Sequence, residues 1–108
     1  MDDTQTTYKL KAQIIKAMAH PSRLMIIEEL AKGERCVCDL KRVVGGDMST
    51  VSKHLAVMRH AGIVEDRKAG LQVFYRLRVP CIIQFFGCVE AVMAATFATF
   101  RERPLGDA

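Results

Sequence analysis

A change of hydrophobic period within residues 48–78 constrains the fold of this chain more than any other feature. The segment MSTVSKHLAVMRHAG, residues 48–62, repeats apolar residues at helical steps of four and three. The next segment, IVEDRKAGLQVFYRLRV, alternates apolar and polar residues as a strand does, with Ala69-Gly70 at a turn. We therefore expect a helix over about 48–61 and a two-stranded wing over about 63–78.

Three helices are expected before this pair. Apolar residues recur at helical spacing over residues 8–19, and Pro21 both breaks that run and suits the first position of a second helix, which Gly33 ends. A short third helix fits residues 38–44, and two glycines then favour a turn. Helix, tight turn, helix and basic hairpin, in that order, outline a winged helix-turn-helix. With 108 residues, the chain is expected to form a single domain, mainly α with a small β-hairpin.

The last apolar segment, from Val79 to Phe100, carries Glu90 as its only charge. It is long enough to span a bilayer, but a central carboxylate is costly in lipid, and we expect no membrane association. Pro80 can begin a helix over about 80–102, with large apolar side chains on one side and small residues on the other. Such a helix is usually buried or lies at a subunit interface.

Cations and short polar side chains gather in the helix over 48–61 and in the wing. Lys and Arg number 16 against 12 Asp and Glu, giving a net charge of +4, a mild lean towards a polyanionic partner. A DNA-reading helix needs short hydrogen-bonding groups near its start and cations for phosphates. The expected contacts to double-stranded DNA are Ser49, Thr50, Ser52, Lys53, His54, Arg59, Arg67, Lys68 and Gln72. Of these, His54 is a candidate for DNA contact or for packing, rather than for metal ligation.

Four cysteines offer soft donor atoms. The first eleven residues are polar and begin acidic, unlike a secretory signal, so we expect a cytoplasmic protein in which structural disulfides are rare. Thiolates then favour soft or borderline ions. Within one helix Cys36 and Cys38 would point about 200° apart, so both can bind one ion only if the helix begins between or after them. Cys81 and Cys88 lie about 10 Å apart along the last helix and cannot share an ion there; each is either a third ligand for the Cys36–Cys38 pair or interface packing.

Three stretches, AMAHPSRLMIIEEL, CVCDL and STVSKHLAVMRHAGIVEDRKAGLQVFYRL, resemble the ArsR/SmtB family of small metal-sensing repressors. The resemblance runs from about residue 12 to 78 and implies a homodimer joined through the first and last helices. It also implies a repressor that leaves its operator when As(III), Sb(III) or a soft divalent metal binds Cys36 and Cys38. The turn departs from the family at Gly46, where an apolar residue is usual, and at Met48, where Gln is common; the departure bears on the operator sequence and not on DNA binding. The family's zinc site of Asp and His residues on the last helix has no counterpart, because residues 79–100 contain neither.

Two alternatives stay open on the residues alone. The same DNA-binding fold can sense oxidants or persulfides through its thiols. The chain can also be a metal buffer or interaction module without an operator. An enzyme is not expected, because the sequence shows no carboxylate pair in a catalytic motif, no nucleophile motif and no phosphate-binding glycine loop.

Overall fold

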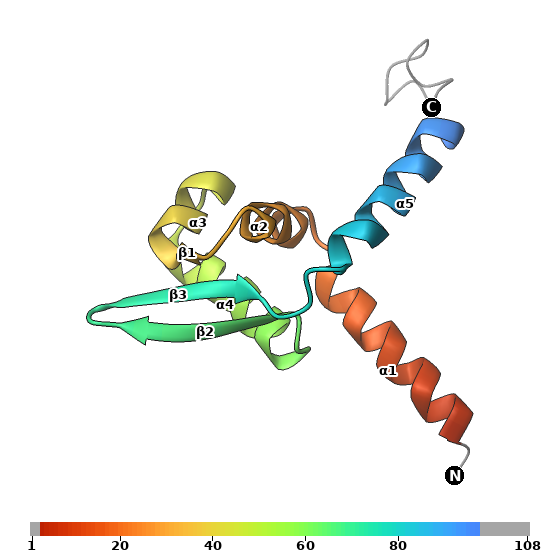
Figure 1. Cartoon of the computed structure of the whole chain (residues 1–108), viewed down its shortest axis with the longest axis horizontal. Coiled ribbons are helices and arrows are strands. Elements are labelled where there is room, and N and C mark those ends of the chain that lie inside the picture. Colours follow the sequence, from red (N-terminus) through yellow and green to blue (C-terminus); the bar gives the residue numbers. More distant parts are fainter. Residues whose placement is uncertain (1–2, 98–108) are drawn as a thin grey trace.

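The computed structural model describes residues 3–97 as a winged helix-turn-helix (Figure 1). Its elements are α1 (Asp3–Met18), α2 (Pro21–Ala31), β1 (Arg35–Cys36), α3 (Val37–Val44), α4 (Met48–His60), β2 (Val64–Ala69), β3 (Gln72–Leu77) and α5 (Ile82–Thr96). Helices α2, α3 and α4 form the body with the sheet, and α1 and α5 project from the end opposite the wing tip. The predicted fold class, mainly α with a small β-hairpin, is confirmed. The sheet also has a third strand, β1, which the sequence did not predict.

Helix boundaries follow from local capping chemistry. His20 is the N-cap of α2, and its Nδ1 accepts a hydrogen bond from the backbone N of Ser22 at 3.0 Å. Pro21 occupies the first helical position, where no intrahelical donor is lost. Gly33 follows the end of α2 with φ +147°, a backbone conformation that L side chains rarely adopt. The chain can therefore leave α2 sharply and enter β1.

The core is formed by apolar side chains of α2, α3 and α4 and of the start of the hairpin. The most deeply buried are Ile26, Ile27, Leu40, Val51, Leu55, Met58, Ile63 and Val64. Burying a side chain of this size contributes about 1.5–3 kcal/mol. In α4 the buried residues recur at steps of four and three, so one face of that helix is committed to the core and the opposite face is left to solvent.

The antiparallel sheet has the order β1-β3-β2. Ala69 pairs with Gln72, so the two-residue turn is Gly70-Leu71, one residue later than the sequence indicated. Gly70 has φ +64°, as expected at the first central position of a tight hairpin turn. β1 pairs Arg35 with Tyr75 and Cys36 with Phe74. The segment just before α3 is thereby joined to the wing.

The projecting helices α1 and α5 expose large apolar side chains. Tyr8 is 63% exposed on α1, and Val92 is 61% exposed on α5. The radius of gyration is 16.4 Å, against about 13 Å for a compact chain of this length. The last helix was expected over 80–102; α5 ends at Thr96, and positions 98–102 lie outside the described residues. Among residues 3–97 no helix is both long and apolar enough to cross a membrane.

Candidate DNA-reading surface and cysteine site

Helix α4, the expected recognition helix, presents a polar face opposite its buried one. Ser49, Thr50, Ser52 and Lys53 are exposed in its first turns, as a DNA-reading helix requires. Asp47 caps the helix: its Oδ1 accepts hydrogen bonds from the backbone N of Thr50 and from Ser49 Oγ, each at 2.8 Å. These hydrogen bonds, led by the one from Thr50, lower the pKa of Asp47 to about 2. An ionised cap therefore fixes the turn from which the side chains expected to read DNA extend.

His54 lies on the buried side of α4. It is 9% exposed, its Nδ1 accepts a hydrogen bond from Arg23 Nε at 3.0 Å, and its ring centroid lies 4.4 Å from that of His20. Burial lowers the pKa of His54, and the charges of His20 and Arg23 lower it further, which favours the neutral ring that can accept this hydrogen bond. The placement argues against the expected contact between His54 and DNA. His54 instead joins α4 to the start of α2.

Two of the expected DNA-binding arginines are held by carboxylates. Arg67 of the wing donates from Nη2 and Nε to the two carboxylate oxygens of Glu34, at 2.6 and 3.0 Å, and its guanidinium lies 5.0 Å from the centroid of the Phe74 ring. The hydrogen bonds to Glu34 raise the pKa of Arg67 and lower that of Glu34. Arg59 Nη1 lies 3.1 Å from Asp66 Oδ2. Both guanidinium groups are therefore engaged within the protein.

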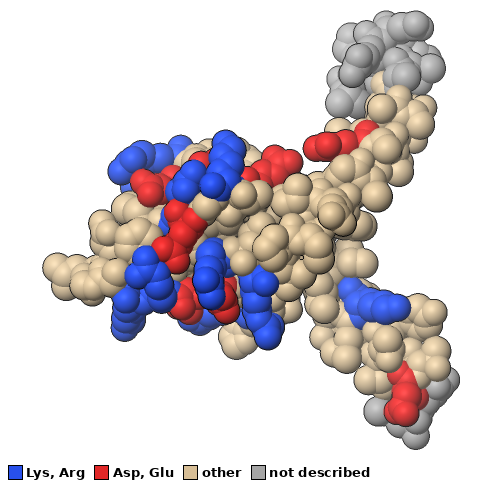
Figure 2. Space-filling model, viewed as in Figure 1, with Lys and Arg blue, Asp and Glu red and all other residues tan. Residues whose placement is uncertain are grey.

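Lys53 and Lys68 differ from those arginines. Both side chains are exposed, and neither takes part in an ion pair within residues 3–97. Gln72 is exposed beside the wing turn. Figure 2 shows Lys and Arg side chains interspersed with Asp and Glu over the body and wing, while the projecting arms carry few charges on this face. Lys53 on α4 and Lys68 on the wing are therefore cations on this surface that no carboxylate of the described residues engages.

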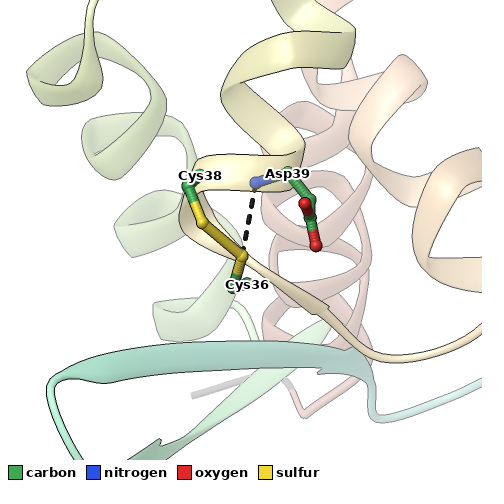
Figure 3. A group of neighbouring side chains, drawn as sticks. All are labelled: Cys36, Cys38 and Asp39. Carbon is green, nitrogen blue, oxygen red and sulfur yellow. Dashed lines mark hydrogen bonds between the residues drawn. A yellow bond between two sulfur atoms is a disulfide. The ribbon is translucent and has the colours of Figure 1, made fainter.

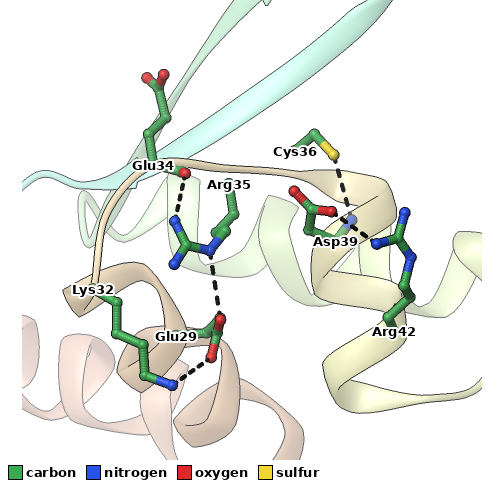
Figure 4. A network of polar contacts seen from close by, with 7 residues as sticks. All are labelled: Glu29, Lys32, Glu34, Arg35, Cys36, Asp39 and Arg42. Carbon is green, nitrogen blue, oxygen red and sulfur yellow. Dashed lines mark hydrogen bonds and ion pairs between the residues drawn. The ribbon is translucent and has the colours of Figure 1, made fainter.

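Ion pairs hold the segment that leads from α2 to the cysteines (Figure 4). Glu29 Oε2 accepts a hydrogen bond from Lys32 Nζ at 3.1 Å, and Glu29 Oε1 lies 3.5 Å from Arg35 Nε. The hydrogen bond from Lys32, with a smaller contribution from Arg35, lowers the pKa of Glu29. Arg35 Nη1 also donates to the backbone O of Glu34 at 2.9 Å. These contacts therefore fix the position at which β1 begins.

Cys36 and Cys38 lie where β1 ends and α3 begins (Figure 3). Cys36 is the N-cap of α3, and the helix begins at Val37, between the two cysteines, as a shared site requires. A disulfide joins them, with Cα atoms 5.4 Å apart. Cys36 is buried and Cys38 is half-buried, and Cys36 Sγ accepts a hydrogen bond from the backbone N of Asp39 at 3.4 Å. The two sulfur atoms thus lie together at the start of α3.

Asp39 is a candidate ligand that the sequence reasoning missed. One ligand atom from each of Cys36, Cys38 and Asp39 lies within 4.8 Å of the others. Asp39 is the third residue after the N-cap, a position from which a carboxylate reaches back towards the helix start. That spacing was the available signal in CVCD. Arg42 Nη1, 3.3 Å from Asp39 Oδ1, faces the same carboxylate.

Cys81 and Cys88 are exposed free cysteines at the start and middle of α5. Helix α5 projects from the end of the body away from α3 (Figure 1). Among the described residues, Asp39 and not a third cysteine lies beside the pair. Within one chain, this placement fits the alternative that Cys81 and Cys88 belong to an interface, and a third ligand from the last helix of a second copy stays a prediction.

Residues 20–66 match the model for bacterial regulatory proteins of the arsR family. The HTH-type transcriptional regulator Rv0081 of Mycobacterium tuberculosis is 36% identical over 93 residues, covering 85% of this chain and 82% of that protein. The biofilm growth-associated repressor of Agrobacterium fabrum is 44% identical over 84 residues, covering 78% and 72%. The arsenical resistance operon repressor of Escherichia coli is 40% identical over 72 residues, covering 66% and 62%.

Solved structures agree with the sequence comparisons. The crystal structure of Rv0081 superposes with a TM-score of 0.76 at 35% identity, covering 86% of this chain and 94% of that one. The homodimeric winged helix-turn-helix domain of Mb0332 from Mycobacterium bovis, solved in solution, gives a TM-score of 0.76 at 29% identity, covering 94% and 92%. The chain therefore belongs to the arsR family of bacterial regulatory proteins, which are DNA-binding transcriptional regulators and not enzymes.

Proposed function

We propose that this chain represses transcription by binding operator DNA as a homodimer, and leaves the operator when As(III), Sb(III) or another soft metal ion binds the thiolates of Cys36 and Cys38. The observation that carries the proposal is the place of the cysteine pair, at the junction of β1 and α3 and next to both DNA-reading elements. The protein would work in the cytoplasm, where such thiols stay reduced.

DNA binding is supported by the free polar face of α4 and by the wing. Ser49, Thr50 and Ser52 are short enough to let the helix backbone approach base edges in the major groove. Lys53 and Lys68 are positioned to contact phosphates, which dominate the affinity of such proteins and make it salt-dependent. Arg59, Arg67 and Gln72 flank this surface and would act at its rim.

Dimerisation is supported by the projecting helices. An apolar groove of about 500 Å³ lies between α1, α2 and α5, lined by Ile15, Leu24, Phe85, Val89 and Met93 among others. An exposed apolar surface of this kind marks an interface. The Mb0332 domain is a homodimer and has a similar fold over most of this chain. A second copy that contributes its own α1 and α5 would cover the groove and place two recognition helices on one duplex.

Ion binding is supported by the donor set. Two cysteine sulfurs and the Asp39 carboxylate form a group that, in its reduced form, suits thiophilic or borderline ions. The disulfide form cannot bind an ion, because neither sulfur is then a thiolate. The E. coli relative is an arsenical resistance repressor, whereas the A. fabrum relative is associated with biofilm growth, so the ion has to be identified by titration.

Coupling to DNA would run through β1 and α3. Cys36 pairs with Phe74 in the wing strand β3, and Glu34, two residues earlier, holds Arg67 in β2. Ion binding that draws Cys36 and Cys38 together with Asp39 would shift both the wing and the helix that supports α4. A coupling free energy of about 1–3 kcal/mol is sufficient for such a switch.

Titration of operator release tests the proposal. The reduced protein on DNA from its own promoter region is titrated with As(III), Sb(III), Cd(II), Pb(II), Zn(II) and, without oxygen, Cu(I), with release followed by fluorescence anisotropy. Wild type is expected to release DNA with at least one ion, and Cys36→Ser and Cys38→Ser to bind DNA but not respond. Cys88→Ser is the matched control. If both serine variants of the pair respond as wild type does, the cysteine pair is not the inducer site.

A second candidate function is thiol-based sensing of oxidants or persulfides, which the Cys36–Cys38 disulfide favours. Two thiols would give two electrons and two protons to a hydroperoxide, whose oxygen–oxygen bond breaks to release water and an alcohol. Mass spectrometry distinguishes the candidates. DNA release accompanied by a loss of two hydrogens, or by added sulfur, supports covalent sensing, whereas release with unmodified cysteines and one bound ion supports metal sensing.

A further inference from the structure

The cysteine pair opens into a pocket that the DNA-reading elements also line. This open pocket of about 300 Å³ has Cys36 and Cys38 on the α3 side, Met48 and Ser52 from α4, and Gln72 from the wing. A ligand held by the cysteines would therefore sit against the first turn of the recognition helix. Asp39, the oxygen donor, is not among the residues that line this pocket.

Core packing does not explain Met48. Its side chain is 42% exposed, whereas Val51, Leu55 and Met58, which anchor α4, are fully buried. Met48 is the first residue of α4 and follows the capping residue Asp47. A methionine side chain has three rotatable bonds and a polarizable sulfur, so it can turn its thioether towards a neighbouring site.

Resting on the proposed function, we propose that Met48 is a third sulfur donor for the Cys36–Cys38 site and makes the site selective for Cu(I). A thioether is a neutral, soft donor, and Cu(I) is the softest of the ions that thiolate and thioether sulfurs select. As(III) takes three anionic thiolates, of which this pocket offers two. The carboxylate of Asp39, which lies outside this pocket, suits harder divalent ions. The choice between Met48 and Asp39 thus decides which class of ion the site retains.

Met48 also connects the ion site directly to the expected DNA-reading residues of α4. It is adjacent in sequence to Ser49, and Ser52 lines the same pocket one helical turn later. An ion that joins Met48 to Cys36 and Cys38 would draw the start of α4 towards α3. The short polar side chains of that turn would then move relative to the base edges.

The test compares Met48→Leu with the matched control Met25→Leu. Met25 is an equally exposed methionine, at 43%, on α2 and outside the pocket. Cu(I) affinity is measured in the absence of oxygen by competition with a chromophoric Cu(I) chelator, and the number of bound sulfurs by X-ray absorption. Loss of even an outer-shell partner costs about 10–100-fold in metal affinity, so Met48→Leu is expected to lose at least about tenfold. The sulfur count should fall from three to two, while Met25→Leu keeps both values and As(III) affinity stays the same in all three proteins.

Failure of this inference is separable from failure of the proposed function. The assignment of Met48 is wrong if wild type does not bind Cu(I), or if Met48→Leu keeps the wild-type affinity and sulfur count. In either case, a response to another ion that depends on Cys36 and Cys38 leaves the proposed function intact. If Cys36→Ser and Cys38→Ser respond normally to every ion, the proposed function fails, and the Met48 assignment fails with it. Circular dichroism checks that each variant is folded.

Discussion

Removal of either free lysine near α4 and the wing should change the salt dependence of DNA binding by a calculable amount. Lys53 and Lys68 are exposed and lack an ion-pair partner among residues 3–97, so each is available to one phosphate. In a dimer, Lys53→Ala or Lys68→Ala removes two phosphate contacts, and the slope of log affinity against log salt should become shallower by about 1.8. Raising salt from about 50 to about 200 mM should then cost the variant about twelvefold less affinity than it costs wild type.

Fluorescence anisotropy on a duplex that spans both half-sites, at several salt concentrations, measures these slopes. Arg67→Ala should change the slope by less than half as much, because Glu34 already engages that guanidinium through two hydrogen bonds. Lys9→Ala, which removes an exposed lysine from α1, is the matched control and should leave the slope unchanged. Wild-type slopes in both lysine variants, or a change in Lys9→Ala as large as theirs, would show that phosphates are not bound at α4 and the wing.

Three further predictions concern stability and ionisation. Leu40→Ala, at the fully buried anchor of α3, should lower the free energy of unfolding by about 2–5 kcal/mol in urea titrations, and a loss below about 1 kcal/mol would show that α3 is not held by the core. Because burial lowers the pKa of His54, the folded state resists protonation of this ring. The stability contributed by the neutral ring should be present above about pH 6.5 and lost as pH falls through the lowered pKa. The urea midpoint of wild type should therefore drop more on acidification than that of His54→Gln. The carboxyl of Asp47 should titrate by NMR with a pKa of about 2, so that the helix cap is retained above the ordinary value of 3.8 and lost as pH falls towards 2; a titration near 3.8 would contradict the observed hydrogen bonds.

Periodicity predicted the helices and the hairpin because apolar residues recur at the spacing of each element, whether that apolar face is buried in the core, as in α4, or exposed, as in α1 and α5. In α4 the spacing of Val51, Leu55 and Met58 gives both the helix and its orientation. β1 escaped prediction because it has two residues, and only its pairing with β3, which is distant in sequence, makes it a strand. The hairpin turn moved from Ala69-Gly70 to Gly70-Leu71 because register is set by the pairing of both strands, which one strand's pattern does not contain.

The sequence predicted where the two cysteine ligands of the candidate site lie, but not which other side chains lie beside them. The spacing of Cys36 and Cys38 implied a helix start between or after them, and α3 begins at Val37. The position of Asp39 beside them depends on cap geometry, and that of Met48 on how two helices pack. For His54 the sequence left DNA contact and packing open, and its burial fits packing; the local pattern could not decide, because its partner Arg23 lies 31 residues away in the chain.

The apolar arms α1 and α5 have a consequence for how much of the protein is functional in a cell. If their exposed side chains are covered only by a second copy, the free energy of folding includes a term for subunit association, and the fraction folded rises with protein concentration. A cell that makes little of this protein would then hold mainly unassembled chains with exposed apolar surface, which proteases remove preferentially. Abundance would thus set both the number of molecules and the share of them able to occupy DNA.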